Sequence, residues 1–363
     1  MTAFPARALL RWYDRGHRDL PWRREPTAYA VLVSELMLQQ TGVATVEPYF
    51  RRFVARFPDV QALAAASEDE VAALWSGLGY YSRARNLRRA AQTIAGALGG
   101  AFPSTEGALR ALPGVGDYTA AAVAAIAFGA RAFALDGNGL RVLARFTGER
   151  APIDLPATRR ALHALGLAAV PRSRPGDFNQ AVMELGATVC TPRRPRCDEC
   201  PLSAACRARA EGAAEELPRK RPRAERPVVR VVCACITDGA RVLVQKRAAG
   251  LLGGTWTLPE QPHTGGRGGS ALARRLAEGV GAQVRDIRRV RYQGSVRHVF
   301  THRDVTADVF RVEARPAPGG QGASARWVPL DGLGAVGVSA FTRKTLALGL
   351  GGSEKRDNAA RAP

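Results

Sequence analysis

The sequence predicts two domains, a helical one followed by a smaller mixed α+β one, and three observations support this fold class. The 363 residues exceed what one core usually accommodates. Apolar residues recur at helical spacing over residues 4–210, whereas they alternate with polar residues beyond Val228. Residues 211–227 are charged, contain proline and have little to bury, which is typical of a linker. We therefore predict a multi-domain protein with an all-α domain over residues 1–210 and an α+β domain over residues 228–350.

Local signals mark elements in both domains. Ser67 is followed three residues later by Glu70, which is the capping-box pattern of a helix start. Beyond the linker, two apolar stretches flank Asp238 and Gly239, a pair that favours a tight hairpin turn. A helix-like segment and two further alternating stretches follow and complete an α+β pattern. The final residues, 351–363, have few apolar side chains, so we expect a disordered tail.

The charge balance favours a nucleic-acid partner. Lys and Arg number 53 against 32 Asp and Glu, which gives a net charge of +21. A broad positive field of this kind concentrates polyanions. Lysine occurs only at Lys220, Lys246, Lys344 and Lys355, so a genomic bias towards arginine is an alternative source of the composition, although it does not explain the net charge.

The composition excludes several other classes of protein. Hydrophobic residues make up 46% and charged residues 23% of the chain, which argues against a disordered or fibrous protein. No run approaches the roughly 18 apolar residues of a membrane span, and the first residues lack the apolar stretch of a signal peptide. We therefore expect a monomeric cytoplasmic protein without membrane contact, associated with the nucleoid if the source is bacterial.

Four of the six cysteines predict a metal centre. They form a C-x6-C-x2-C-x5-C array made of Cys190, Cys197, Cys200 and Cys206. Four thiolates suit a [4Fe-4S] cluster or a structural zinc ion, and the single C-x2-C pair favours the cluster, because zinc ribbons usually contain two. With four protein ligands no coordination position stays open, so we predict a structural role. The other two cysteines lie in an apolar strand-like stretch and are expected in the core.

Glu35 is a candidate general acid. On a helix its neighbours three and four residues away include Val31, Leu32 and Leu38, so its carboxyl group lies along an apolar face. Such a carboxyl group tends to keep its proton towards neutral pH. The alternative is an ordinary solvated helix glutamate.

Two further segments have both a functional and a structural interpretation. Gly114 and Gly116 permit a tight turn before a helix that opens after Asp117, and the amides of such a turn can bind an anion or can simply connect two helices. Asp136 ends an apolar stretch and precedes a helix, so it is either an N-cap or the second carboxylate that glycosyl-bond cleavage requires.

Taken together, these motifs resemble those of the A/G-specific adenine DNA glycosylases, the MutY type. The resemblance covers about residues 10–210 in consistent order and rests on the cysteine array and on the segments LPW, VSELMLQQT, GLGYYSRARNL, LPGVGDYTA, LDGN and MELGATVCTPRRPRC. It implies a helix-hairpin-helix fold of the endonuclease III-like superfamily with a [4Fe-4S] loop. It also implies an enzyme that flips adenine out of a mispair with 8-oxoguanine or guanine in double-stranded DNA and hydrolyses its N-glycosidic bond.

The resemblance also implies roles for individual residues. Glu35 resembles the acid that protonates adenine and then handles the water, and Asp136 resembles the carboxylate that stabilises the sugar cation. By the same resemblance, Tyr118 and Asn138 would line the reaction centre, and Glu184 would orient the base. Gln40 and Tyr80 would enter the duplex, and the backbone amides of Gly114, Val115 and Gly116 would hold a phosphate. Glycosylase-lyases carry a lysine where Tyr118 stands, so we expect no efficient strand cleavage.

The second domain resembles the MutT-like (Nudix) domain that completes this family. Phe300, Thr301 and His302 resemble the short loop that reads 8-oxoguanine. Arg275 and Gly279 stand where a Nudix hydrolase has magnesium-binding glutamates, so we expect binding without pyrophosphate hydrolysis. The chain departs from the family at two positions: the family commonly has serine where Thr301 stands, in the loop that reads 8-oxoguanine, and a larger residue where Gly139 stands. A non-catalytic iron-sulfur DNA-binding protein and a nucleotide pyrophosphohydrolase are the alternative functions.

Overall fold

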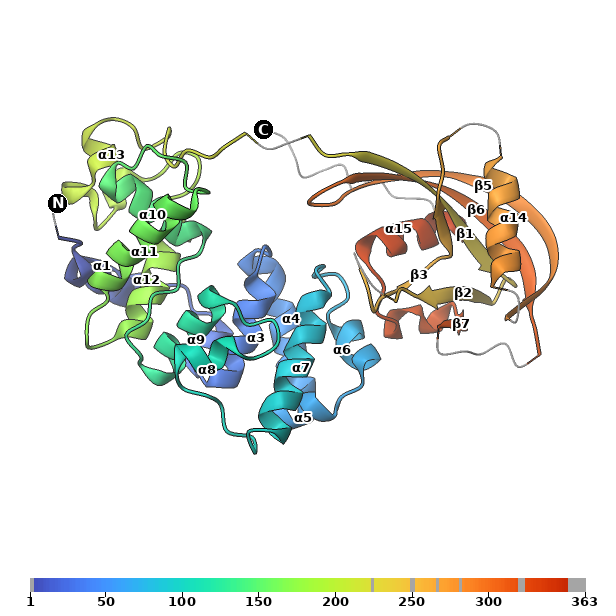
Figure 1. Ribbon diagram of the computed structural model, residues 1–363, viewed down its shortest axis with the longest axis horizontal. Helices are drawn as coiled ribbons and strands as arrows, with labels where there is room; N and C mark the ends of the chain where they lie inside the picture. The colour runs from blue at the N-terminus through green and yellow to red at the C-terminus, as the bar shows by residue number, and fades with distance from the viewer. Residues whose placement is uncertain are drawn as a thin grey trace. The chain divides into compact units, whose positions relative to one another are not determined.

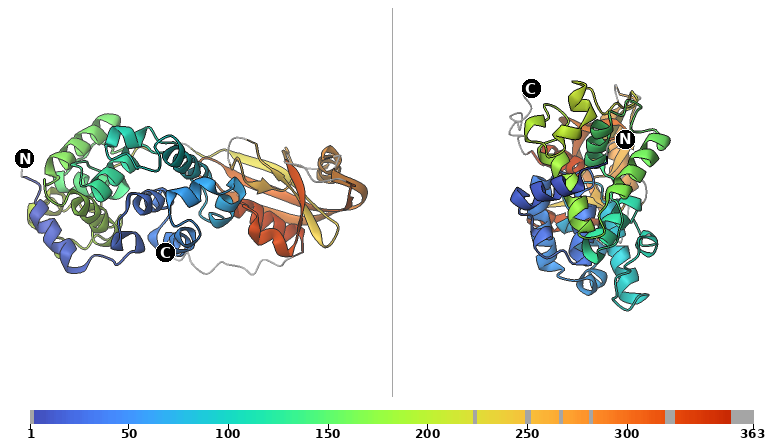
Figure 2. Two further views of the ribbon diagram at one scale, coloured as in Figure 1. Left: turned by 90° about the horizontal axis from the view of Figure 1, so that it is seen from below. Right: turned by 90° about the vertical axis from the view of Figure 1, so that its left-hand side faces the viewer.

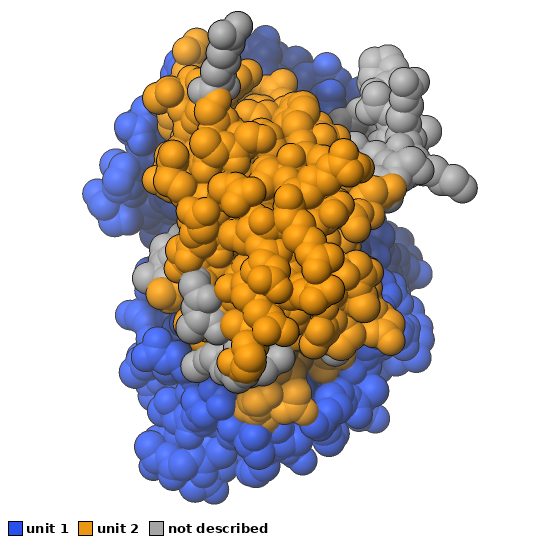
Figure 3. Space-filling model, turned by 90° about the vertical axis from the view of Figure 1, so that its right-hand side faces the viewer, with its two compact units in different colours: residues 1–65, 86–223 blue, residues 66–85, 224–363 orange. Residues whose placement is uncertain are grey.

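The protein forms two compact units, and neither is a continuous stretch of sequence. The computed structural model describes residues 3–222, 225–248, 252–265, 268–280, 283–318 and 324–351. One unit comprises residues 1–65 and 86–223, and the other comprises residues 66–85 and 224–363 (Figure 3). Residues 66–85 thus belong with the C-terminal unit, although they lie within the range that we expected for the helical domain. The predicted tail lies outside the described residues, apart from Gly351.

The N-terminal unit is built from helices, as the sequence predicts (Figure 1). Helix α7 (Ser82–Gly96) begins in the segment that belongs to the other unit and continues into this one. The other elements of the N-terminal unit are α1 (Ala6–Gly16), α2 (Pro21–Arg24), α3 (Ala28–Leu38), α4 (Val43–Arg56), α5 (Val60–Ala65), α8 (Glu106–Arg110), α9 (Asp117–Phe128), α10 (Gly137–Thr147), α11 (Pro156–Ala169), α12 (Pro175–Thr188), the 3-10 turns η1 (Cys197–Glu199) and η2 (Ser203–Ala205), and α13 (Arg207–Ala210).

Two apolar helices lie at the centre of this unit. Eight of the eleven residues of α3 are buried, and α9 packs against it with a run of buried small residues. A helix that is apolar on all sides must be enclosed by other helices. Helix α12 contacts α9, α10 and α1, and it completes a second core with Phe133 and Phe178. The first part of the predicted linker packs against this unit, because Ala213 and Leu217 are buried against Ala208.

The described residues of the C-terminal unit form a mixed seven-stranded sheet. The path β3-β2-β1-β6-β5 is antiparallel except for the parallel pair β1 and β6, while β4 pairs with β1 and β7 with β2. Its elements are α6 (Glu68–Leu74), β1 (Val228–Thr237), β2 (Arg241–Lys246), β3 (Trp256–Thr257), β4 (Glu260–Pro262), α14 (Gly269–Gly279), β5 (Val284–Val299), β6 (Asp304–Pro316), β7 (Ala325–Pro329), η4 (Asp331–Ala335) and α15 (Ala340–Gly349). The hairpin turn predicted at Asp238 and Gly239 is confirmed, because it joins the antiparallel strands β1 and β2.

Each face of this sheet is covered by one helix (Figures 1 and 2). Helix α14 lies over Val232 and Phe310, and α15 covers the other face, where Cys233 and Cys235 are buried as predicted. The capping box of Ser67 and Glu70 is also confirmed at the start of α6. None of the helices in the described part of the chain is long and apolar enough to span a membrane.

A close contact between α11 and the core of the N-terminal unit yields a test of the fold. A methyl group at Gly166 would lie 2.1 Å from a ring carbon of Phe133, which is buried. We expect Gly166→Ala to lower the free energy of unfolding by about 1–3 kcal/mol, because the ring must shift within a packed core. Thermal melting followed by circular dichroism measures this loss. Gly107→Ala is the control, because nothing lies within 4 Å of a methyl group there, and equal melting temperatures for the two variants would contradict the packing.

Candidate active site

Glu35 is enclosed by the apolar helix that the sequence predicted for it. Glu35 is only 5% exposed and lies among the buried residues Val31, Leu32 and Leu36 of α3. Burial raises the pKa of Glu35 to about 7 from its ordinary value of 4.5; a hydrogen bond from Tyr118 opposes the rise, and the charge of Asp136 adds to it. A carboxyl group with this pKa is partly protonated at neutral pH, so it can donate a proton.

Tyr118 reaches Glu35 from the start of α9. Its hydroxyl group donates a hydrogen bond of 2.6 Å to Glu35 Oε2 and lies 3.6 Å from the sulfur atom of Met183. Burial raises the pKa of the Tyr118 hydroxyl well above 10, so the group stays protonated and acts as a donor. The turn before α9 sets this position: Gly114 has a φ of +76°, and a methyl group on it would lie 2.4 Å from Asn86 Cβ.

Asp136 is both an N-cap and a member of the site. It caps α10: its Oδ1 accepts from the Gly139 amide at 2.6 Å, and its Oδ2 accepts from Asn138 Nδ2 at 2.9 Å. Burial raises the pKa of Asp136, and these hydrogen bonds oppose the rise. Asn138 is held in turn by Arg141, whose guanidinium group donates to Asn138 Oδ1 at 2.8 Å and to the carbonyl group of Cys190 at 2.7 Å.

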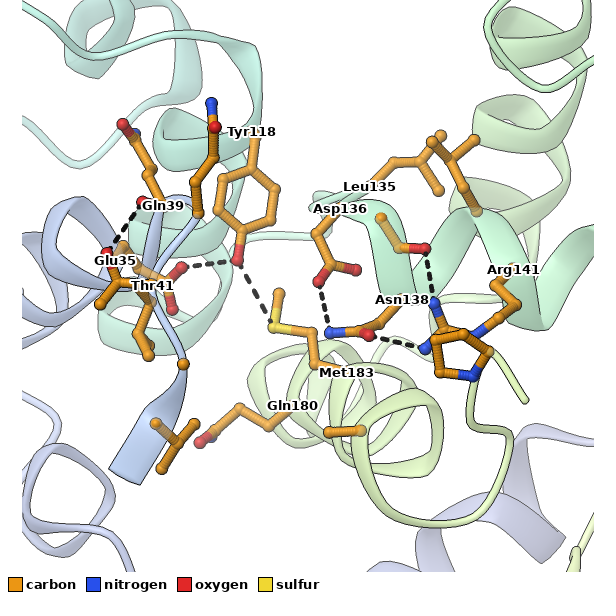
Figure 4. Close-up of a pocket in the computed structure, with 18 of the residues that line it drawn as sticks. Glu35, Gln39, Thr41, Tyr118, Leu135, Asp136, Asn138, Arg141, Gln180 and Met183 are labelled. Carbon is orange, nitrogen blue, oxygen red and sulfur yellow. Dashed lines mark hydrogen bonds between the residues drawn. The ribbon is translucent and has the colours of Figure 1, made fainter. Parts of the chain in front are cut away.

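The four residues meet at one cavity of about 1340 Å³ (Figure 4). Glu35, Tyr118, Asp136 and Asn138 all line it, and Figure 4 shows Tyr118 projecting between the two carboxyl groups. Sequence patterns could not show that Glu35 and Asp136 lie near one another, because about a hundred residues separate them. A buried acid and a second carboxyl group at one cavity are the pair that N-glycosyl cleavage requires.

The predicted metal ligands gather around a second, small cavity. Cys190, Cys197, Cys200 and Cys206 line a space of about 30 Å³ together with Arg145. Four thiols around a common space are the donor set that a [4Fe-4S] cluster requires. Arg145, only 2% exposed, supports this loop by donating to the Cys190 sulfur at 3.3 Å and to the Thr191 carbonyl group at 2.7 Å.

Comparisons with known proteins agree with this geometry. Residues 33–165 match the HhH-GPD superfamily of base excision DNA repair proteins, residues 190–206 match the iron-sulfur binding domain of endonuclease III, and residues 231–348 match the NUDIX domain. The chain is 37% identical to the adenine DNA glycosylase of Homo sapiens over 95% of this chain and 73% of that protein. It is 45% identical to the adenine DNA glycosylase of Mycolicibacterium smegmatis over 56% of this chain and 69% of that protein.

The chain belongs to the adenine DNA glycosylases. It is a base excision repair glycosylase, a hydrolase of N-glycosyl bonds, and its loop of four cysteines is the iron-sulfur site. A solved thermostable thymine-DNA glycosylase is 30% identical and matches 57% of this chain and 95% of its own, with a TM-score of 0.53. The predicted fold class is therefore confirmed: a helix-hairpin-helix glycosylase fold with an iron-sulfur loop, followed by a Nudix-like domain.

Other residues expected at the glycosylase site lie around it in different ways. Gln40 lines the active-site cavity just after α3, with a φ of +58°. In the turn before α9 the Val115 amide donates to the Leu112 carbonyl group, so the amides of Gly114 and Gly116 stay as the candidates for a phosphate contact.

Glu184 does not line the cavity but holds two arginines that do. Both of its carboxylate oxygens accept from Arg18, at 2.7 and 2.8 Å, and Oε2 also accepts from Arg23 at 2.9 Å. Burial alone would raise the pKa of Glu184, but these arginines outweigh it and lower the pKa. Sequence reasoning missed Arg18 and Arg23, as well as Gln180 and Met183 of α12, which also line the cavity. The LPW motif, which lies between the two arginines in the sequence, was a signal for these two cavity residues but not for their ion pairs with Glu184.

In the C-terminal unit, the loop expected to read 8-oxoguanine is a tight turn between β5 and β6. The Phe300 amide donates to the Arg303 carbonyl group at 2.9 Å, which places Thr301 and His302 at the exposed tip. The hydroxyl group of Thr301 is hydrogen-bonded to that of Tyr80. Tyr80 and Thr301 are 221 positions apart in the sequence, and the resemblance assigns both to contacts with DNA. The structure brings them together within one unit.

Residues 66–85 are attached to the sheet of this unit by several polar contacts. Asp69 of α6 accepts hydrogen bonds from Lys246 Nζ at 3.0 Å and Trp256 Nε1 at 3.2 Å. The hydroxyl groups of Ser76 and Tyr81 both donate to the Val338 carbonyl group, at 2.9 and 2.6 Å. These contacts hold the segment that carries Tyr80 against the domain that carries Thr301.

The buried acid predicts a pH-dependent stability. Because folding raises the pKa of Glu35 from 4.5 to about 7, its protonation stabilises the fold fully below pH 4.5, and this stabilisation is lost as the pH rises to about 7. Glu35→Gln keeps the site neutral, so we expect it to exceed the parent in stability at pH 8, by up to about 3 kcal/mol, and to match it near pH 5. Melting temperatures at both pH values measure the difference. The exposed Glu215→Gln is the control, and parallel curves for Glu35→Gln and the parent would contradict the burial of a raised-pKa acid.

A second prediction concerns the attachment of residues 66–85. We expect Asp69→Asn to weaken the contacts to Lys246 and Trp256 by about 1 kcal/mol, because the charge is lost while the shape is kept. Hydrogen exchange followed by mass spectrometry should then show faster exchange of the amides of residues 66–85. Glu278→Gln, an exposed change on α14, should leave that exchange as it is. Unchanged exchange in the Asp69 variant would show that Asp69 does not hold the segment.

Proposed function

We propose that this enzyme removes adenine paired with 8-oxoguanine, and more slowly adenine paired with guanine, without efficient strand cleavage. The observation that carries the proposal is the pair at the active-site cavity, where Glu35 has a pKa of about 7 and Asp136 lies across from it. A binding protein has no need for a buried acid that faces a cavity, since its burial costs free energy. The cavity is also large enough for a flipped nucleotide.

The chemistry follows from the protonation states of the two carboxyl groups. Protonated Glu35 gives its proton to a ring nitrogen of adenine while the bond between the base and C1′ of the sugar breaks. The electron pair of that bond leaves with the base, and positive charge develops on the sugar. The Asp136 carboxylate stabilises this charge, held in place by Gly139 and Asn138. Water then adds to C1′ and returns a proton to Glu35, so the acid is regenerated.

Strand cleavage by the lyase route requires a primary amine that attacks C1′. Tyr118 stands where a lysine would be needed, and its hydroxyl group is engaged with Glu35. Lys220 is the first lysine of the sequence, and it lies at the edge of the same cavity with an exposed side chain. Borohydride trapping of a covalent complex with product DNA therefore tests this part of the proposal. A complex that forms in the parent protein and disappears in Lys220→Arg would overturn the monofunctional assignment.

Selectivity for 8-oxoguanine is proposed to come from the C-terminal unit. The turn that carries Phe300, Thr301 and His302 is exposed at its tip, and Thr301 supplies a hydroxyl group as serine would. Its hydrogen bond to Tyr80 fixes the hydroxyl group beside an aromatic ring that can stack on a base. Arg275 and Gly279 of α14 stand where a Nudix hydrolase has magnesium-binding glutamates, which supports a domain that binds rather than hydrolyses.

Single-turnover kinetics test the proposed reaction. Duplexes with adenine opposite 8-oxoguanine, guanine or thymine are incubated with excess protein and analysed with and without alkali. We expect alkali-dependent cleavage to be fastest with adenine opposite 8-oxoguanine and slower with adenine opposite guanine. The duplex with adenine opposite thymine should not be cleaved. Glu35→Gln should slow excision at least about 10³-fold, because it removes the acid, and Asp136→Asn should bind the mispair but fail to cut.

The control for these variants is Glu215→Gln, which changes an exposed carboxylate at the rim of the same cavity and should react like the parent protein. If Glu35→Gln turned over at the parent rate, Glu35 would not be the acid. Absence of adenine release from parent protein shown to contain iron and sulfide would favour the binding-protein alternative.

A further inference from the structure

The far end of the hairpin formed by β5 and β6 contains a cavity that the proposed function does not use. Its volume is about 490 Å³. It is lined by the turn between β1 and β2, the start of β5 and the end of β6, and five arginines contribute to it: Arg241, Arg285, Arg288, Arg311 and Arg315. The acidic lining residues are Asp238 and Glu313. Among the lining residues, positive charge therefore exceeds negative charge by a clear margin.

The carboxylates do not neutralise this arginine cluster. Asp238 is occupied by one arginine, because its Oδ2 accepts from Arg241 Nε at 2.9 Å and its Oδ1 accepts two backbone amides. Glu313 lies opposite Arg289 across the ladder. Within the described residues, Arg285, Arg288 and Arg315 form no ion pair, whereas Arg297 on the same strand β5 is paired with Asp304 at 2.8 Å.

Strand pairing places like charges directly opposite one another. In the register of β5 and β6, Arg285 faces Arg315 and Arg291 faces Arg311. Opposed like charges destabilise a sheet unless a counter-ion lies between them. In addition, the Nε atom of Arg311 is buried and has no hydrogen-bond partner within the described residues. A donor in this situation is satisfied when an oxyanion enters the cavity.

We propose that this arginine cavity binds phosphate groups of the DNA backbone outside the mispair, an inference that rests on the proposed function. Among the described residues that line it, none has an aromatic side chain on which a free nucleotide could stack, whereas guanidinium groups from three chain segments suit consecutive phosphates. The cavity and the loop at Phe300 lie at opposite ends of the same hairpin. Arg288 and Val299 are eleven residues apart on β5, which is at most about 36 Å and corresponds to about ten base pairs at 3.4 Å each.

Duplex length provides the test. Binding is measured by fluorescence anisotropy in a Glu35→Gln background, so that no adenine is removed, with duplexes of about 15 and about 40 base pairs that carry a central mispair with 8-oxoguanine. The proposal places the cavity about ten base pairs from the mispair, so the short duplex, with about seven base pairs on each side, should end before the cavity and the long one should extend past it. The variant is Arg285→Ala with Arg315→Ala, and the control is Arg274→Ala with Arg275→Ala, two exposed arginines of α14. Both double variants remove the same charge.

We expect the Arg285/Arg315 variant to lose about 10-fold in affinity for the long duplex at low salt. The slope of log Kd against log salt should fall by about two, for two phosphate contacts, while the short duplex should be bound as by the parent. The control should bind both duplexes as the parent does. Unchanged affinity for the long duplex would overturn the proposal. The cavity would then have an occupant other than DNA, such as an acidic protein.

Equal losses on both duplexes, or equal losses in the control, would also overturn it, because they would indicate a general effect of charge. Melting temperatures of the two double variants exclude misfolding as the cause of a loss. Excision by protein with an intact Glu35 is measured separately, so failure of the proposed function and failure of the arginine cavity give different results.

Discussion

The contact on which the catalytic unit depends is the hydrogen bond between Tyr118 and Glu35, which joins its two innermost helices. Helix α3 is enclosed because it is apolar on nearly every side, and Glu35 is enclosed with it. A buried carboxylate without a partner would be strongly unfavourable, so the group is stabilised by keeping its proton and by accepting from Tyr118. The same burial that secures the helix pair therefore prepares the acid. Stability and acidity cannot be tuned independently at this position.

The second carboxylate depends on the metal loop rather than on α3. Asp136 is fixed by the first turn of α10, and Arg141 and Arg145 of that helix both bond to the cysteine loop. Arg145 also donates to the Leu217 carbonyl group, which ties the start of the predicted linker to the same helix. Loss of order in the loop would release both guanidinium groups from their acceptors. Arg141 also donates to Asn138, which in turn donates to Asp136, so the loop supports Asp136 through Arg141.

Sequence patterns predicted what depends on local spacing. Periodicity identified Glu35 as an acid on an apolar face, the capping box located α6, and the cysteine spacing indicated one cluster-sized site. The same patterns could not show that α3 and the start of α10 share a cavity, because that depends on how helices a hundred residues apart pack. They also could not show that Glu184 is occupied by Arg18 and Arg23, since an ion pair across 161 or more positions leaves no local signal.

The sequence did not show that residues 66–85 belong to the C-terminal unit, and the reason is different. The segment has a helical sequence and continues into α7, so its period matches the N-terminal domain. Its partners are instead single polar groups on the sheet, such as Lys246, Trp256 and the Val338 carbonyl group. This arrangement distributes the residues assigned to the proposed function over the two units. The acid, the second carboxylate and the cavity belong to the N-terminal unit, whereas Tyr80 and the loop at Thr301 belong to the C-terminal one. Under the proposed function, a change at the loop of Thr301 therefore affects the selection of the opposite base and leaves the chemistry at adenine intact.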